Sequence, residues 1–390
     1  MKRTSLMAAV LAMACLIPAG NSPAFAQDAK VTLKGGPTIE SADGNFKFSI
    51  GGRVHLDAAA YDEDGVAMNN GFLFRRAQLG ADVTVYKDWH FKTQYDFAEN
   101  AVGFSDVYLR YTGFDGLKIT AGQFKMPFSL EEMTSSNNIT FMERSLPSIY
   151  AAARRIGVGI DVQQPLFTAS AAVYGRNVGT TTIGDEPLAV GGRVTFTPFN
   201  SDGSVLHVGG AVAYEWTDDS DALRLRQRPE SRVDGVRLVD TGGIANASAQ
   251  FKYGLELAGV LGPFSLQGEY MGSSVKRRTG LSSVNTDGYY VMGSWILTGE
   301  SRKYSGGTFS GVSPTRNMGA IEVAARYSTL DLNDTGIVTG GKMENITVGT
   351  NWYVNRNVRM MANYVRVNTD ALGPRSDDPN IFQIRLQANF

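Results

Sequence analysis

A run of arginines at alternate positions is the feature of this chain with the clearest chemical potential. Arg224, Arg226 and Arg228 stand at every second position, and Arg232 and Arg237 follow. Guanidinium groups stay charged at physiological pH and donate paired hydrogen bonds to phosphate oxygens. Residues two apart diverge on an α-helix but share one side of an extended segment. The spacing therefore predicts a row of cationic groups along one side of a strand or loop, suited to a passing anion.

Overall charge does not explain this run. The chain has 37 basic and 38 acidic residues, a formal net charge of −1. Residues 1–26 have a basic start, an apolar stretch and small residues before Gln27, which is typical of a secretory signal peptide. Removing that peptide would leave a net charge of about −3. Recognition of an anion must therefore come from local arrangement.

Other site chemistries find little support. Cys15 is the only cysteine and lies inside the predicted signal peptide, which excludes disulfides, cysteine-ligated metals and cysteine catalysis from the mature chain. The three histidines, His55, His90 and His207, have no metal spacing. His55 shares a strand face with Asp57, but no serine is marked as a nucleophile. No cofactor is expected, and a barrel hydrolase is the disfavoured alternative.

The elements that position the arginines read as long strands. Between residues 46 and 61 apolar side chains such as Phe48 and Leu56 occupy even positions, and polar ones such as Arg53 and Asp57 occupy odd positions. This alternation runs well beyond the five or six residues of an average strand. The pattern recurs in about sixteen segments. They are 46–62, 72–86, 89–99, 103–112, 116–124, 156–163, 166–175, 189–198, 204–216, 250–260, 263–273, 286–298, 317–329, 343–353, 357–369 and 380–390.

The connections between these segments differ in length. Tight turns are predicted at 86–89, 112–116, 261–264 and 353–357, whereas 125–155 and 217–249 are long. Trimmed turns at one end and elaborate loops at the other are typical of an outer-membrane barrel. A β-sandwich is disfavoured because its strands would be shorter. The sequence thus predicts an all-β, antiparallel transmembrane barrel of about 16 strands over residues 27–390, closed on itself around an aqueous lumen.

Several segments resemble a known family, the phosphate- and polyphosphate-selective porins of Gram-negative outer membranes. They are "FLFRRAQL" (72–79), "SDVYLRYTGF" (105–114), 122–145, 288–304, 348–365 and the last strand. That strand ends on Phe390, which resembles the signal that such barrels present to their assembly machinery. The resemblance implies a homotrimer in the outer membrane, in contact with lipid and lipopolysaccharide, with inward-folded loops that narrow each pore.

The resemblance also implies site residues. In the family an arginine ladder guides phosphate or polyphosphate to a constriction. The matching positions are Arg224, Arg226 and Arg228 for the ladder, Arg75 and Arg76 for paired constriction arginines, Asp106 for the acidic member, Ser135 and Ser136 for tandem serines, and Arg144. Rings of arginine or lysine in a pore select anions.

One position departs from the family pattern. Glu132 stands where anion-binding members carry a lysine, and a charge reversal beside a bound anion costs several kcal/mol at intermediate dielectric. Lys125 is the candidate compensating cation. Alternatively, Glu131, Glu132 and Glu143 neutralise nearby arginines and hold the loop in the lumen.

Other interpretations remain open from the sequence. The arginine run would also suit an outer loop that contacts lipopolysaccharide phosphates, and Arg154 and Arg155 fit the rim as well as the pore. The same fold would serve a weakly selective porin or one for organic anions or sugars, although inward aromatic residues are sparse. Export and the barrel pattern argue against nucleic-acid binding.

Overall fold

The computed structural model describes residues 29–33, 35–98, 102–179, 187–201, 203–217, 223–278, 280–370 and 376–390. The predicted signal peptide, residues 1–26, lies outside these ranges. Within them, no helix has the length and hydrophobicity needed to cross a membrane.

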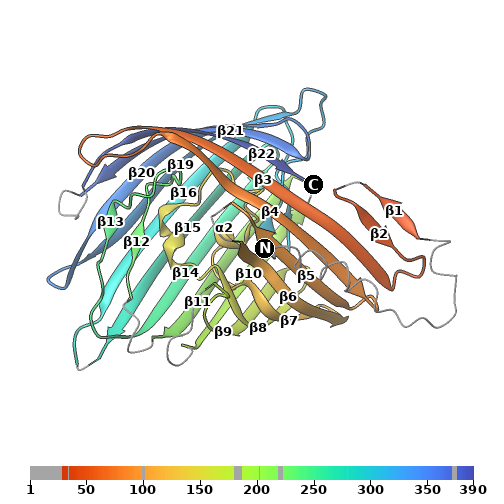
Figure 1. Ribbon diagram of the computed structural model, residues 1–390, viewed down its shortest axis with the longest axis horizontal. Helices are drawn as coiled ribbons and strands as arrows, with labels where there is room; N and C mark the ends of the chain where they lie inside the picture. Colours follow the sequence, from red (N-terminus) through yellow and green to blue (C-terminus); the bar gives the residue numbers. More distant parts are fainter. Residues whose placement is uncertain are drawn as a thin grey trace, which may run out of the picture.

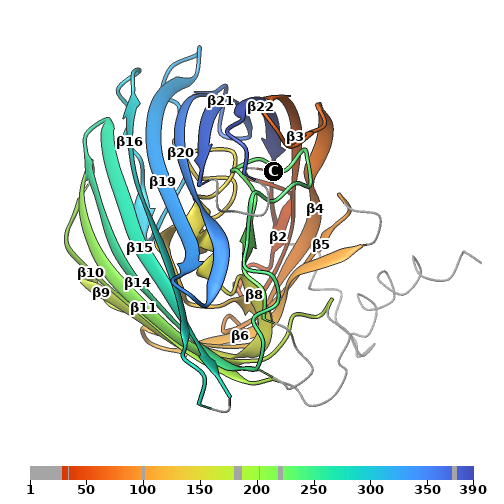
Figure 2. The ribbon, with the colours of Figure 1, turned by 90° about the vertical axis from the view of Figure 1, so that its left-hand side faces the viewer.

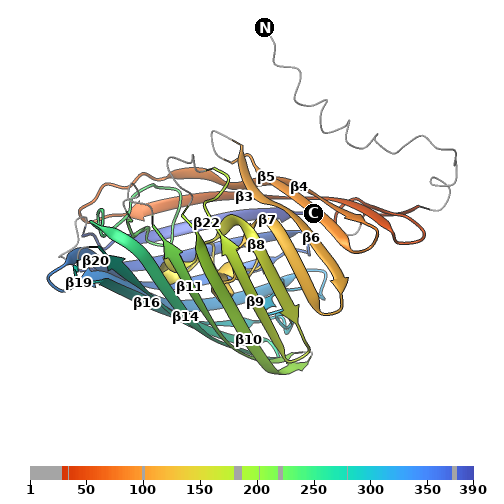
Figure 3. The same cartoon turned by 90° about the horizontal axis from the view of Figure 1, so that it is seen from below.

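Sixteen long antiparallel strands in the described part of the chain form a closed barrel (Figures 1 and 2). Each strand pairs with the next along the chain, and β22 pairs with β3 to close the wall. The strands of the wall are tilted relative to the barrel axis (Figure 3). They are β3 (Phe46–Asp62), β4 (Gly71–Val85), β5 (Trp89–Asp96), β6 (Gly103–Phe114), β7 (Leu117–Lys125), β8 (Arg154–Gln163), β9 (Phe167–Tyr174), β10 (Ala189–Ser201), β11 (Ser204–Trp216), β14 (Ala247–Leu261), β15 (Phe264–Arg277), β16 (Val284–Ile296), β19 (Ala320–Asp334), β20 (Val338–Tyr353), β21 (Val358–Thr369) and β22 (Asn380–Asn389).

The predicted alternation of faces is confirmed in these strands. In β22, Phe382 and Ile384 are 55% and 46% exposed on the outer surface, whereas Gln383 and Arg385 are each 2% exposed on the inner one. All sixteen predicted segments coincide with a strand of the barrel, including the weakly patterned 166–175, which is β9. Apolar residues outside and polar residues inside are what a lipid-facing wall requires.

A small hairpin precedes the barrel. It consists of β1 (Lys30–Thr32) and β2 (Thr38–Glu40). Strand β2 pairs with the first residues of β3, Thr38 opposite Ser49, below the point where β22 ends opposite Arg53. The hairpin therefore extends the sheet beyond the barrel seam (Figure 1).

Two long loops enter or cover the lumen from the same end. The inner loop (residues 126–153) carries α2 (Leu130–Met133) and η3 (Leu146–Tyr150), and most of its apolar side chains are buried. The outer loop (residues 223–246) carries β12 (Arg226–Gln227) and β13 (Val239–Asp240). Its strands contact η3 and β20, so it covers the inner loop.

The opposite end is not uniformly short, contrary to the sequence prediction. The short-end segment (residues 297–319) joins β16 to β19 and forms a hairpin of β17 (Tyr304–Ser305) and β18 (Thr308–Phe309). Gly306 and Gly307 at its tip have φ of 58° and 78°, which a two-residue hairpin turn requires. Phe309 is buried in a cluster with Leu130 of α2. The lumen is therefore filled from both ends.

Candidate pore constriction

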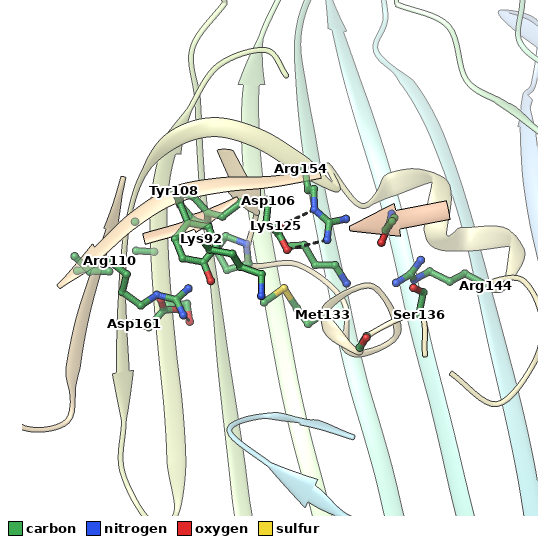
Figure 4. Close-up of a pocket in the computed structure, with 18 of the residues that line it drawn as sticks. Lys92, Asp106, Tyr108, Arg110, Lys125, Met133, Ser136, Arg144, Arg154 and Asp161 are labelled. Carbon is green, nitrogen blue, oxygen red and sulfur yellow. Dashed lines mark hydrogen bonds and ion pairs between the residues drawn. The ribbon is translucent and has the colours of Figure 1, made fainter. Parts of the chain in front are cut away.

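A polar cavity of about 310 Å³ lies between the inner loop and the wall formed by β3 to β9 (Figure 4). Seven cationic and two acidic side chains line it. The cationic ones are Arg53, Arg76, Lys92, Arg110, Lys125, Arg144 and Arg154, and the acidic ones are Asp106 and Asp161. The cavity is therefore strongly electropositive in a chain that is nearly neutral.

A β-bulge aims two adjacent arginines into the lumen. His55 pairs with Arg76 and Leu56 pairs with Phe74, so Arg75 is the extra residue. Arg75 donates to Glu143 of the inner loop at 2.7 and 3.0 Å. Arg76 lines the cavity, and its buried Nη1 has no hydrogen-bond partner among the described residues. One arginine thus holds the loop, while its neighbour keeps a donor unused.

The tandem serines meet an arginine that the sequence analysis did not single out. Arg53 Nη1 lies 3.0 Å from Ser136 Oγ and 3.4 Å from Ser135 Oγ. Arg53 occupies a polar position of the alternation in β3, which was the available signal for it. The serine hydroxyl groups accept hydrogen bonds from Arg53 without cancelling its positive charge.

Asp106 is neutralised by an arginine at the end of the inner loop. Arg154 Nε and Nη2 lie 2.6 and 3.2 Å from the two carboxylate oxygens of Asp106. Both residues line the cavity, so Arg154 lies at the pore, whereas Arg155 lines a separate hollow with Arg176 and Glu215.

Glu132 is turned towards cations and is absent from the described cavity lining. Its carboxylate lies 3.0 Å from Arg144 Nε and 3.6 Å from Lys125 Nζ. Burial favours the neutral carboxyl group, but Arg144 and Lys125 outweigh it and lower the pKa of Glu132 below its usual range. Arg144 also donates to the carbonyl oxygens of Glu131, Glu132 and Thr134 at 3.0 to 3.2 Å. Lys125 therefore forms a direct ion pair with Glu132.

The arginine run lies apart from this cavity, on the outer loop. Arg224 and Arg226 are exposed, and Arg224 pairs with Asp240. Leu225 between them packs into the core. Arg228 is half-buried, and burial together with Arg232 and Arg237 lowers its pKa to about 10. Arg75 adds to that repulsion and Glu143 opposes it, so the charge interactions of Arg228 extend to the Arg75–Glu143 pair.

Comparison with known proteins places the chain in a family. It matches the model described as phosphate-selective porin O and P over residues 48–390. It is 32% identical to Porin O of Pseudomonas aeruginosa over 434 residues, which covers 98% of this chain and 97% of that protein. The chain belongs to the phosphate-selective porin O and P family.

Solved porin structures share the fold of this family member. An anion-selective porin from Comamonas acidovorans superposes with a TM-score of 0.61 at 14% identity, covering 88% of this chain and all of that one. A trimer form of OmpT of Vibrio cholerae superposes with a TM-score of 0.58 at 11% identity, covering 88% of this chain and 99% of that one. The protein is an outer-membrane porin and a channel, not an enzyme, as predicted.

Four further arginines of this porin hold the inner loop in place. These anchor arginines are each at most 5% exposed, and each donates to backbone carbonyl oxygens of the loop. The acceptors are the carbonyl oxygens of Asn138 for Arg302, Glu143 for Arg326, Asn137, Ile139 and Thr140 for Arg359, and Met142 for Arg385. None of the four could be singled out from the sequence, because backbone acceptors in the loop leave no residue pattern.

Each anchor arginine also has a carboxylate. Arg302 lies 2.7 Å from Glu322, and Arg359 lies 4.0 Å from it. The carboxylates for the other two are Glu131 and Glu230 for Arg326, and Asp57 and Glu143 for Arg385. Glu131 and Glu143 therefore do hold the inner loop in the lumen, which was one interpretation from the sequence.

Proposed function

We propose that this porin conducts anions, with phosphate and condensed phosphates as its preferred solutes, through the cavity beside the inner loop. The observation that carries this proposal is the excess of seven cationic over two acidic lining groups. Arg154 pairs with Asp106, and Arg144 and Lys125 pair with Glu132, so these charges largely offset one another. The positive field that remains comes mainly from Arg53, Arg76 and Arg110. A cationic ring in a narrow pore favours anions over cations.

The donors of the cavity suit a tetrahedral oxyanion. Arg76 has an unpartnered buried nitrogen, and Ser135 and Ser136 hold Arg53 on the same cavity. An anion that leaves water needs donors to replace its hydration shell, and bonds from guanidinium groups are roughly twice as strong as neutral ones. Arg76 would bind the anion directly, and the serines would orient Arg53 and donate their hydroxyl protons.

The outer loop would deliver anions to this site. Four arginines of this loop lie close enough to repel one another, namely Arg226, Arg228, Arg232 and Arg237. Their combined charge gives the loop a positive electrostatic potential that attracts anions. Charged groups at a pore mouth raise the encounter rate of opposite ions, and salt screens this effect. The arginine run would thus act on entry, and the cavity on selectivity.

A sugar channel finds less support. The aromatic side chains of the described cavity lining are Tyr108 and Phe124, which do not form a track along the lumen. The proposed assembly is a homotrimer, in line with the trimer form of the related fold. Phe390 exchanges backbone hydrogen bonds with Gly52 at 3.1 Å, and we propose that it first serves as the recognition signal for barrel assembly.

Single-channel recording in planar bilayers tests the proposal. A salt gradient should give an anion-selective reversal potential, and phosphate or pyrophosphate at micromolar to millimolar concentration should block the chloride current. A cation-selective reversal potential would contradict the anion channel. Chloride conduction without block by either phosphate would reduce the protein to a weakly selective porin.

A further inference from the structure

We propose that the outward face of β11, β14 and β15, with the hollow beside it, binds the lipid A part of a lipopolysaccharide molecule. This site lies outside the pore and is independent of what the pore conducts. It has three layers, namely an apolar hollow, a shelf of aromatic rings and a cationic edge.

The hollow is the deepest layer. It has a volume of about 500 Å³ and an almost entirely apolar lining from β8 to β11 and β14. Few side-chain atoms project into its centre, because Gly192 has no side chain and its neighbour Ala171 has a small one. Gly192 pairs with Ala171 on one side and with Val212 on the other. Ile160 and Phe251 lie at its two sides. In a bilayer a saturated acyl chain would fill this hollow, because an empty void forfeits dispersion contacts.

The aromatic shelf flanks the hollow and reaches the loop end at Trp216, the last residue of β11. Tyr214 and Phe251 line the hollow. The Tyr214 and Trp216 rings lie 4.9 Å apart, and Tyr253 lies 6.0 Å from Phe251 and 6.1 Å from Tyr270. Aromatic rings with polar tips are enriched at the level of the lipid head groups. The shelf therefore marks where a bound lipid would change from chain to head group.

The cationic edge lies directly beyond the shelf. Lys276 is exposed, and its Nζ lies 5.5 Å from the centre of the Tyr214 ring. Arg278 follows and donates to the carbonyl oxygen of Thr217, next to Trp216, at 3.4 Å. Asp287 accepts a hydrogen bond from Tyr270 at 2.6 Å, on the side of the shelf away from the hollow. Among the described residues, Lys276 and Arg278 thus give the edge above the hollow two cations that complement a phosphate.

The order of these layers identifies the ligand. An amphiphile with several acyl chains and a phosphorylated head fits a hollow, a shelf and a cationic edge in that order. Lys276 lies at the end of the barrel that carries the inner and outer loops, which faces the outside of the cell. The leaflet at that end consists of lipopolysaccharide, so we commit to lipid A over a glycerophospholipid.

Native mass spectrometry of the assembled porin in detergent tests this site. The probes are hexa-acylated lipid A with two phosphates, the same lipid A without phosphates, and phosphatidylglycerol. Phosphorylated lipid A should bind most tightly, and Lys276→Glu should weaken its binding about tenfold. Lys276→Gln should have a smaller effect in the same direction. Val212→Trp, which fills the hollow, should weaken the binding of both forms of lipid A.

Arg366→Glu is the matched control, because Arg366 is exposed on the outer face of β21, four strands further round the wall. It should change lipid A binding less than twofold. All variants should keep the wild-type conductance, which shows that the barrel has formed. Equal binding of phosphatidylglycerol, no lipid A on the assembled protein, or equal effects of the changes at 276 and 366 would each overturn the proposal.

Discussion

The two walls of the lumen carry arginines with different surroundings. On the wall from β19 to β22, anchor arginines such as Arg326 and Arg385 combine a carboxylate with carbonyl oxygens of the inner loop. On the adjoining wall from β3 to β6, Arg53, Arg76 and Arg110 have no ion pair among the described residues and line the cavity. Arg53 meets hydroxyl groups, and Arg110 donates to Thr120 at 2.9 Å.

This difference shows how one residue type serves two purposes in one lumen. A buried cation with a carboxylate and carbonyl acceptors has its charge and donors satisfied, so it fixes structure. A cation that meets only neutral groups keeps its field and can attract a mobile ion. The partner, and not the arginine, decides between the two.

The largest effect should come from an anchor. Arg385→Ala would leave Asp57 buried without a cation and Met142 without its donor, which should lower the free energy of unfolding by about 3–5 kcal/mol. Urea unfolding followed by gel mobility measures this. The double variant Asp57→Asn with Arg385→Gln should recover part of the loss, because no charge is left unpaired. Wild-type stability in Arg385→Ala would erase the distinction between the walls.

A cavity arginine should behave in the opposite way. Arg76→Ala should weaken phosphate block of the chloride current about ten- to hundredfold, the equivalent of one or two charge-assisted hydrogen bonds, with little change in unfolding. Arg76→Lys keeps the positive charge but lacks the paired guanidinium donors, so phosphate block should fall between that of the wild type and that of Arg76→Ala. A large loss of stability in Arg76→Ala, with block intact, would make Arg76 another anchor.

Glu132 lies between the two classes and should give a smaller effect. Glu132→Gln would release Arg144 and Lys125 from their carboxylate and shift the reversal potential modestly towards anions. Protonation would act in the same direction, but Arg144 and Lys125 lower the pKa of Glu132 below its usual range, so lowering the pH from 7 to 5 should not reproduce the shift. Reduced anion selectivity in the variant would show that Glu132 positions Arg144 for binding.

The smallest effect should come from the exposed run. Arg226→Ala should slow phosphate entry about twofold at 0.1 M salt and leave it unchanged at 1 M salt, where the screening length is about 3 Å. The association rate of the block, measured at both salt concentrations, checks this. A change that persists at 1 M salt would place Arg226 in direct contact with the permeating anion.

The barrel could be predicted from the sequence because strand alternation is a local property. The polar face of β3 already contained Arg53 and Asp57. Other features depend on relations between distant strands. Regular alternation would place Arg75 and Arg76 on opposite faces, and only the register against β3 reveals the bulge.

The short-end segment was missed for a different reason. A Gly-Gly pair between Tyr304-Ser305 and Thr308-Phe309 signals a hairpin, but a hairpin signal does not say that the hairpin enters the lumen. That outcome depends on the pocket that Leu130 and its neighbours offer to Phe309. The position of the arginine run relative to the cavity could likewise not be predicted from the sequence, because it depends on how the outer loop packs on η3.

The bonds of Arg385 also set an order of events during biogenesis. Arg385 lies on the last strand, Asp57 lies on the first, and the inner loop contributes Met142 and Glu143 between them. The ion pair with Asp57 can form only when β22 reaches β3. Closure of the wall and full anchoring of the inner loop are therefore completed together, and a chain that still waits for its final strand has neither a sealed membrane wall nor a fully anchored constriction.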